Sequence, residues 1–356
     1  MILRGPKCCL LFEKRLKERA PLGIKSPSTH FNYHYTNHQL KPSNRPKMST
    51  SVPTRKVLLI GATGSIGSII LQALLSSSTP VSVTILKRAA STAPLPPSVP
   101  VITVPSYDQP LSALVPIFRD FDVIISCQTT FSVSSQLNLI NAAIQAGVKR
   151  FFPSEYGLNN MRPDTQALCP VFKEKGTIQQ YLRDNQDKME WTSVSCGTWP
   201  TWSFHNNFLG LNLKSKSVKY WDDGEGRFSI STEESTALAV VRAVTTHWDE
   251  TRNRNVFLSE VVTSQKELVA EIEKQLGEKL NVEKVVTEEE IERLKGRLEV
   301  SKGGDVVAVV GLVEAGLTSG RFGTDFEKEE EVMTERLGLP RKTLEEMVKD
   351  GLASLK

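Results

Sequence analysis

Cysteine is scarce in this sequence, and five residues in a chain of 356 cannot form a disulfide scaffold. Charged residues make up 24% and hydrophobic residues 39%, which is typical of a globular chain. These values exclude disorder of the whole protein and a fibrous or collagen-like architecture. At roughly 150 residues per domain, the length predicts one to three domains.

Acidic residues are almost absent from residues 1–50, which hold two Glu against ten Lys and Arg. The net charge of +4 therefore arises in this segment, and the remainder of the chain offers no basic excess for binding nucleic acid. Repeated prolines and the lack of a sustained hydrophobic period predict that residues 1–50 are a disordered basic tail. Translation from Met48 would remove most of it. We expect a cytoplasmic protein, with mitochondrial targeting by the tail as a minor alternative.

Charge is also absent from residues 57–86, a stretch long enough to cross a membrane. Three glycines and Pro80 divide this stretch into strand, turn, helix, turn and strand. A buried βαβ unit explains each of these breaks, whereas a membrane helix explains none. We therefore expect no membrane association.

The turn of this unit, Gly61–Gly67, has the sequence Gly-Ala-Thr-Gly-Ser-Ile-Gly and joins the apolar run 56–60 to an amphipathic helix. Its first glycine permits the tight turn, its second lets a pyrophosphate approach the backbone, and its third allows close packing of helix on strand. The helix N-terminus then directs free N–H groups at the phosphates. The pattern predicts a dinucleotide site with contacts from Gly61, Thr63, Gly64, Ser65, Ile66 and Gly67.

Lys87 and Arg88 follow the second predicted strand, where an acidic side chain would bind the ribose hydroxyl of NAD. A cationic pair suits the 2′-phosphate of NADP instead. The alternative is two solvated charges at the end of a strand. The sequence thus predicts NADP(H) as the cofactor.

Further short apolar runs at 101–104, 123–126, 151–152 and 191–195 alternate with helical patterns. This alternation predicts an α/β fold, a doubly wound parallel sheet whose site lies at the carboxyl ends of its strands. We expect an NADP-binding Rossmann domain at 51–200. Residues 201–356 would form mainly a smaller α/β substrate subdomain, with some elements returning to the sheet.

No tyrosine in the chain has a lysine four residues later, so the familiar phenolic acid/base pair of short-chain reductases is missing. Either another group serves in its place or the protein does not turn over a substrate. Both alternatives stay open at this point.

Three segments together resemble the NmrA-like atypical short-chain dehydrogenase/reductase family, in particular its isoflavone reductase-like subgroup. They are the glycine turn, Val148–Gly157 (Val-Lys-Arg-Phe-Phe-Pro-Ser-Glu-Tyr-Gly) and Phe172–Ile178 (Phe-Lys-Glu-Lys-Gly-Thr-Ile). The segments Trp221–Arg227 and Leu339–Leu344 agree, so the resemblance covers about residues 55–350. It implies an NADPH-dependent reductase of a small aromatic or conjugated metabolite. The alternative is an NADP(H)-sensing regulator that binds a protein partner without turnover.

The resemblance implies that Lys175, which opens a Lys-x-x-Ile pattern, is the catalytic base beside the nicotinamide. The alternative is a surface lysine, with Lys173 as the reserve candidate. The chain departs from the subgroup at Gln179 and Gln180, where arginines are usual, and this change affects the predicted substrate pocket.

The remaining candidates follow predicted strands. Cys127 and Ser154 are expected to contact the cofactor; the substrate candidates are Glu155, Tyr156, Trp199 and His205. A structural turn is the alternative for Ser154 and Glu155, and core packing is the alternative for the aromatic-rich loop 199–208. No spacing suggests a metal site, and we expect a monomer or homodimer.

Overall fold

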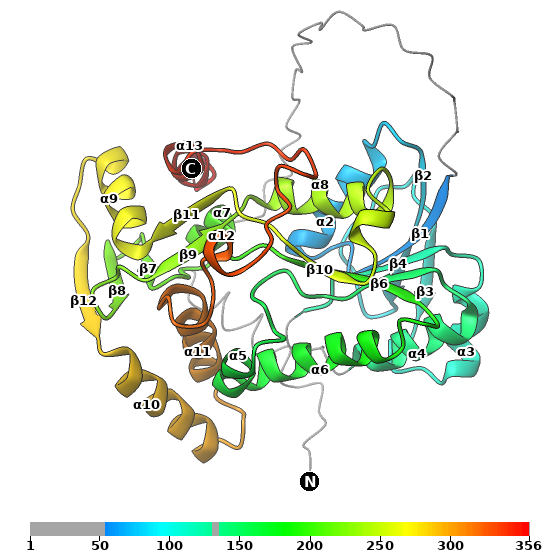
Figure 1. Cartoon of the computed structure of the whole chain (residues 1–356), viewed down its shortest axis with the longest axis horizontal. Helices are drawn as coiled ribbons and strands as arrows, with labels where there is room; N and C mark the ends of the chain where they lie inside the picture. Colours follow the sequence, from blue (N-terminus) through cyan, green and yellow to red (C-terminus); the bar gives the residue numbers. More distant parts are fainter. Residues whose placement is uncertain (1–53, 130–134, 356) are drawn as a thin grey trace, which may run out of the picture. The chain divides into compact units, whose positions relative to one another are not determined.

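The computed structural model describes residues 54–129 and 135–355 (Figure 1). The predicted basic tail, residues 1–50, lies outside the described residues. All of the architecture below belongs to the unit that begins at Thr54.

A seven-stranded sheet occupies the centre of this unit, in the order β10-β6-β5-β4-β1-β2-β3. Every neighbouring pair in it is parallel. The strands are β1 (Arg55–Ile60), β2 (Val81–Arg88), β3 (Val101–Val104), β4 (Val123–Ser126), β5 (Arg150–Phe152), β6 (Glu190–Ser195) and β10 (Arg254–Phe257). The predicted doubly wound α/β fold is confirmed.

Helices cover both faces of the sheet, because each central strand is apolar on both sides. In β1, Val57 and Leu59 face one core, and Leu58 and Ile60 face the other; all four side chains are fully buried. The first core includes α2 (Ser65–Leu75) and α8 (Glu233–Val244). The second core lies under α3 (Leu111–Phe118), α4 (Gln136–Ala146) and α6 (Pro170–Asp184).

The uncharged stretch 57–86 forms β1, α2 and the start of β2, as the βαβ interpretation predicts. Between 54 and 355, leaving out 130–134, none of the helices is both long enough and apolar enough to cross a membrane. Strand β2 runs two residues further than expected, so Lys87 and Arg88 are part of the strand rather than the loop after it.

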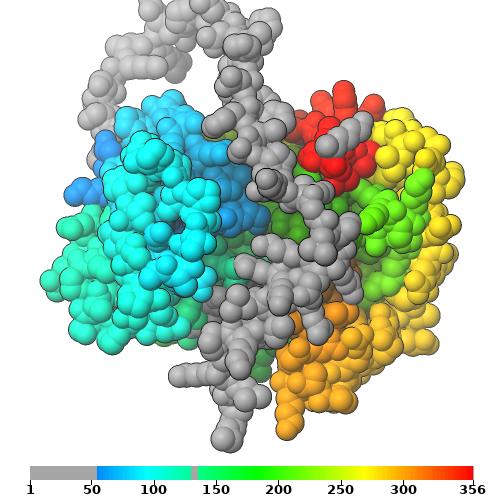
Figure 2. Space-filling view, turned by 180° about the vertical axis from the view of Figure 1, so that it is seen from behind, coloured from blue at the N-terminus to red at the C-terminus, as the bar shows by residue number. Residues whose placement is uncertain are grey.

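The C-terminal part builds two small sheets beside the central one. One pairs β9 (Arg227–Ile230) with β11 (Val261–Ser264), and the other joins β7 (Leu211–Asn212), β8 (Ser217–Trp221) and β12 (Asn281–Val285). The core of the second of these sheets also takes residues from α5 (Pro163–Leu168), α9 (Gln265–Leu276), α10 (Thr287–Val300), α11 (Val306–Thr318) and α13 (Leu344–Ala353). Seen from behind, the cyan segments around β3 and α3 and the yellow segments of α9 and β12 lie on opposite sides of this unit (Figure 2).

Local sequence signals explain several helix ends. Ser264 and Thr343 cap α9 and α13, each in a reciprocal capping box with a glutamate three residues later. Gly147 ends α4 in the left-handed region at φ 78°, a conformation that glycine adopts without strain.

The aromatic segment expected to be a loop instead contains the short helix α7 (Pro200–His205), which Pro200 begins. The acidic run 327–331 overlaps another short helix, α12 (Phe326–Glu329).

Candidate functional site

The glycine turn between β1 and α2 is built by backbone contact. Gly61 has φ +81°, and a Cβ on it would overlap the carbonyl of Cys127 at the end of β4. A Cβ on Gly67 would overlap the Gly61 carbonyl, so α2 packs against the turn with no room for a side chain. Two of the three glycine roles expected from the spacing, the tight turn at Gly61 and the close packing at Gly67, therefore have a steric basis.

The first residues of α2 are arranged to receive an anion. Gly64 is the N-cap and supplies no side-chain cap, and the first turn of the helix holds no acidic residue. Thr63, Gly64 and Ser65 are exposed, whereas Ile66 and Gly67 are buried. The helix N-terminus thus presents open N–H groups and a favourable dipole, which is the chemistry that a pyrophosphate requires.

The cations of β2 stand at the same edge of the sheet as this turn. Ile60, the last residue of β1, pairs with Leu86 of β2. Lys87 and Arg88 follow Leu86 in the same way that the glycine turn follows Ile60. Lys87 donates to the Ser91 carbonyl at 3.3 Å, and neither cation pairs with a carboxylate within 54–129 or 135–355. Two uncompensated charges here suit an anionic group next to the turn.

Two loops at the carboxyl ends of β4 and β5 are tied together. The Ser154 hydroxyl donates to the Gln128 carbonyl at 2.7 Å, and the Ser154 N–H donates to Gln136 Oε1 at 2.8 Å. Cys127 lies under the glycine turn, and its thiol is 3.6 Å from the Tyr156 hydroxyl. Burial raises the pKa of Cys127 to about 12, so this thiol stays protonated and is a poor nucleophile.

Lys175 lies on the inward face of α6, which begins with Pro170. Its side chain is buried, and Nζ donates a hydrogen bond of 2.5 Å to the main-chain carbonyl of Glu155. Desolvation lowers the pKa of Lys175, and the charge of Glu155 opposes that effect. The surface alternative is therefore wrong for Lys175, whereas the reserve candidate Lys173 is exposed.

The Glu155 carboxyl group is also buried. Its Oε2 accepts from Asn160 Nδ2 at 2.6 Å and from Gln179 Nε2 at 2.8 Å, while Oε1 is one of the buried atoms without a partner. Burial raises the pKa of Glu155, and Lys175 pulls it back down. Burial thus disfavours the charged forms of both Glu155 and Lys175, and their mutual attraction counters that penalty.

Sequence reasoning missed Asn160 and missed the contact made by Gln179. Asn160 lies on the loop after β5, and no local pattern marks it. Gln179 stands one helical turn after Lys175, so helical spacing places both on one face of α6. Between them, Gly176 lies so close to the Asn160 carbonyl and the Gln166 side chain that a Cβ would overlap both.

The other predicted substrate residues are more dispersed. Tyr156 has φ 48° and directs its hydroxyl to Cys127, close under the glycine turn. Trp199 Nε1 donates to the Thr236 hydroxyl at 3.0 Å. His205 is exposed at the end of α7, with Nε2 3.0 Å from the Ser354 hydroxyl. The structure therefore joins Glu155 to Lys175 and Tyr156 to Cys127. Trp199 and His205 instead hydrogen-bond to Thr236 and Ser354.

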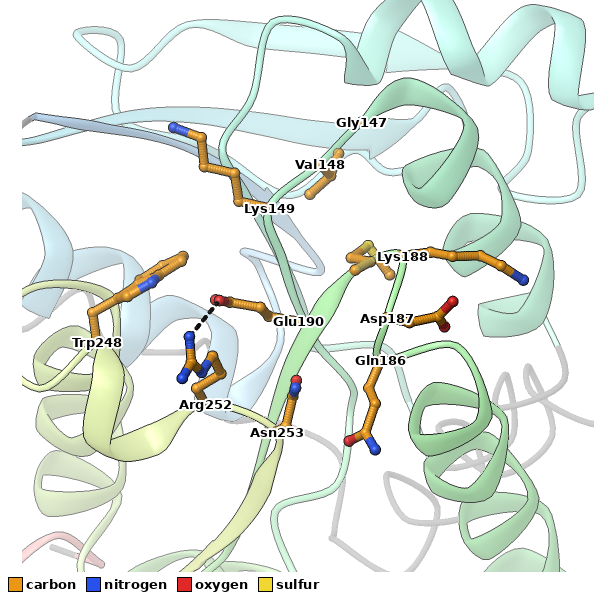
Figure 3. A pocket seen from close by; sticks show the side chains of 11 residues that line it. Gly147, Val148, Lys149, Gln186, Asp187, Lys188, Glu190, Trp248, Arg252 and Asn253 are labelled. Atoms are coloured by element: carbon orange, nitrogen blue, oxygen red, sulfur yellow. Dashed lines mark ion pairs between the residues drawn. The ribbon is translucent and has the colours of Figure 1, made fainter.

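A hollow of about 590 Å³ lies at the opposite edge of the sheet. Its lining includes the residues just before β5, β6 and β10, which are the amino ends of parallel strands. Four of the surrounding side chains are those of Lys149, Trp248, Glu190 and Arg252 (Figure 3). Glu190 and Arg252 point toward one another and form an ion pair with an N···O distance of 3.7 Å. The hollow is therefore remote from the turn. In the described ranges, no group of three or more His, Cys, Asp or Glu is arranged to hold a metal ion.

A parallel sheet with helices on both faces, and a glycine turn from its first strand into a helix, defines the Rossmann-like class of α/β folds. Within that class, the NmrA-like family model matches residues 53–302. The chain belongs to the NmrA-like family, and the expected family resemblance is confirmed.

Two curated relatives illustrate the match. Oxidoreductase aprR of Aspergillus flavus is 32% identical over 297 residues, which are 83% of this chain and 98% of that protein. Phenylcoumaran benzylic ether reductase PT1 of Pinus taeda is 30% identical over 260 residues, or 67% of this chain and 80% of that protein.

Solved structures share the fold. A crystal structure of isoflavone reductase superposes with a TM-score of 0.65 at 22% identity, covering 84% of this chain and 99% of that one. The binary complex of leucoanthocyanidin reductase with NADPH from Vitis vinifera gives a TM-score of 0.66 at 18% identity, with 84% and 99% covered.

Proposed function

We propose that this protein is an NADPH-dependent oxidoreductase that reduces a small aromatic or conjugated metabolite, with Lys175 assisting proton transfer. Three kinds of support converge on this function. The family relatives are named oxidoreductases and reductases, the glycine turn fits a dinucleotide, and a buried lysine lies at the same edge of the sheet.

The residues present fit NADP(H). The uncapped start of α2 would hold the pyrophosphate, and Lys87 and Arg88 would hold the 2′-phosphate. Ser154 and the backbone of Cys127 would border the nicotinamide end of the site. When bound, the reduced nicotinamide supplies a hydride to an electrophilic carbon of the substrate.

Lys175 would supply the accompanying proton transfer. Its pKa is lowered by burial, so the amine can exchange a proton nearer to neutral pH than an exposed lysine can. The Glu155 carbonyl fixes the direction of Nζ, and the surrounding apolar residues of α6, Phe172 and Ile178, keep water away from the helix face. The single observation that carries the proposal is the buried amine of Lys175, which a hydrogen bond to the Glu155 main-chain carbonyl orients toward the loop after β5.

The test is to follow the absorbance of NADPH while the protein is incubated with phenylpropanoid and quinone-like compounds. Oxidation of NADPH that depends on one of these compounds and on Lys175 is the expected result. Discrimination between oxidised and reduced cofactor, without turnover of any compound, would favour the regulator described above instead.

A further inference from the structure

Tyr107 lies in the loop between β3 and α3 and reaches back to the end of β2. Its ring is buried, and its hydroxyl donates to the Leu86 main-chain carbonyl at 3.2 Å. The main chain of the loop is held as well, because Asn138 Nδ2 of α4 donates to the carbonyls of Tyr107 at 3.1 Å and Gln109 at 2.8 Å. Tyr107 is therefore fixed at the edge of the sheet where the glycine turn begins, since Leu86 pairs with Ile60.

Arg88 lies over the Tyr107 ring. Leu86 and Arg88 are two positions apart on β2, so their side chains share one face of the strand, and a ring tethered at Leu86 comes within reach of Arg88. The guanidinium carbon Cζ is 5.6 Å from the ring centroid, a distance at which a cation is attracted to an aromatic face. Burial raises the pKa of Tyr107, although the charge of Arg88 opposes that rise, so the hydroxyl stays protonated at neutral pH and keeps its hydrogen bond.

The contact with the ring leaves the donors of Arg88 available. The Arg88 side chain is exposed, and within residues 54–129 and 135–355 it has neither a hydrogen bond nor an ion pair. A guanidinium can offer two parallel N–H groups to one phosphate, and the attraction to the ring uses none of them in a hydrogen bond. An arginine that is already held beside a ring also loses less conformational freedom on binding an anion than a free arginine does.

We propose that Tyr107 is a positioning residue for cofactor selection, which acts through Arg88. The ring holds the guanidinium at the end of β2, where the 2′-phosphate of NADPH would lie. The inference rests on the proposed function, in which Arg88 contacts that phosphate. It adds that the preference for NADPH over NADH depends on a residue of the loop between β3 and α3.

NADPH and NADH differ only in the 2′-phosphate, so the ratio of their affinities isolates the recognition of this group. Calorimetric titration of the full-length protein gives both affinities. Tyr107→Leu is expected to weaken NADPH binding by about two- to fivefold, the range of an exposed cation–π contact, and to leave NADH affinity unchanged. Tyr107→Phe retains the ring and should give a ratio closer to that of the wild type than Tyr107→Leu does.

Tyr181 provides a matched control for the loss of a tyrosine ring. It lies on α6, packs against the same hydrophobic core as Tyr107, and donates its hydroxyl to Asn141 Oδ1 at 2.6 Å. Tyr181→Leu therefore removes a ring from that core but not the ring beside Arg88, and it should leave the affinity ratio unchanged. In the Arg88→Ser background, Tyr107→Leu should have no further effect on the ratio, because the group that the ring holds is gone.

The possible outcomes separate this role from the proposed function. A wild-type preference for NADPH that Tyr107→Leu leaves intact would overturn the positioning role while the proposed cofactor stands. An equal loss of preference in Tyr107→Leu with and without Arg88 would overturn it too, because the ring would then act by another route. Equal affinities of the wild type for both dinucleotides would contradict the proposed cofactor itself, and the positioning role with it.

Discussion

Lys175 and Glu155 are joined twice: the lysine Nζ donates to the glutamate main-chain carbonyl at 2.5 Å, and the two buried side chains attract each other electrostatically. The helix α6 and the loop after β5 therefore meet at one proton-exchanging group. Asn160 and Gln179 both donate hydrogen bonds to Oε2 of the Glu155 carboxyl group. This arrangement supplies most of the predictions that follow.

Replacing Lys175 by alanine is expected to remove nearly all turnover while NADPH affinity stays within a few fold. The loss should be about 10²–10⁴-fold in kcat, the range that a positioned acid or base contributes. Steady-state kinetics and calorimetry of NADPH binding measure the two effects. Lys173→Ala, two residues earlier and exposed, is the control and should keep wild-type kcat. Wild-type turnover by Lys175→Ala would remove the lysine from the mechanism.

The pH dependence of kcat/KM should respond to Glu155→Gln. The Glu155 charge raises the pKa of Lys175 against the lowering by burial, so removing the charge lowers that pKa further. The limb of the profile that reports Lys175 should therefore move to lower pH in the variant. The amide keeps an oxygen that can accept from Asn160. A limb that stays in place, or moves to higher pH, would show that the two groups are not coupled.

The cations of β2 should select the cofactor. NADPH is expected to bind at least ~10-fold more tightly than NADH, equivalent to about 1.4 kcal/mol. In the double variant Lys87→Ser with Arg88→Ser, NADPH affinity should fall while NADH affinity, measured by the same calorimetry, stays the same. Equal wild-type affinities for the two dinucleotides would contradict the role given to these side chains.

Two glycines of the turn offer a matched comparison. A Cβ on Gly67 would overlap the Gly61 carbonyl, so Gly67→Ala should lower the free energy of unfolding by about 1–3 kcal/mol. A Cβ on Gly64 would lie 3.4 Å from the same carbonyl, so Gly64→Ala should cost no more than ~1 kcal/mol.

Gly64→Ala should nevertheless weaken NADPH binding, because Gly64 is exposed at the start of α2 and a methyl group there would crowd a phosphate that approaches the backbone. Urea denaturation and calorimetry separate the effects. Similar unfolding free energies for the two variants would argue against the packing of α2 on the turn.

Local patterns predicted much of the fold. The segment from β1 to β2 could be predicted because its apolar strands, helical spacing and glycines all lie within one short stretch of sequence. The structure confirms that this segment is a βαβ unit. Helix α7 escaped prediction because six residues are too few to display a helical period.

The surroundings of Lys175 were less accessible to sequence reasoning. Glu155 and Gln179 are 24 positions apart, and His205 bonds to a residue 149 positions away. Tertiary packing alone brings such partners together. Only the shared helix face of Lys175 and Gln179 was present in the local spacing.

The most direct test of the account is a crystal structure of the protein with NADP⁺ bound. The account predicts that the pyrophosphate lies at the start of α2 and that the nicotinamide ring lies beside Lys175 Nζ. The ring and Nζ should be close enough to contact the same substrate molecule. A nicotinamide that points away from α6, with Lys175 sealed behind Glu155, would contradict it.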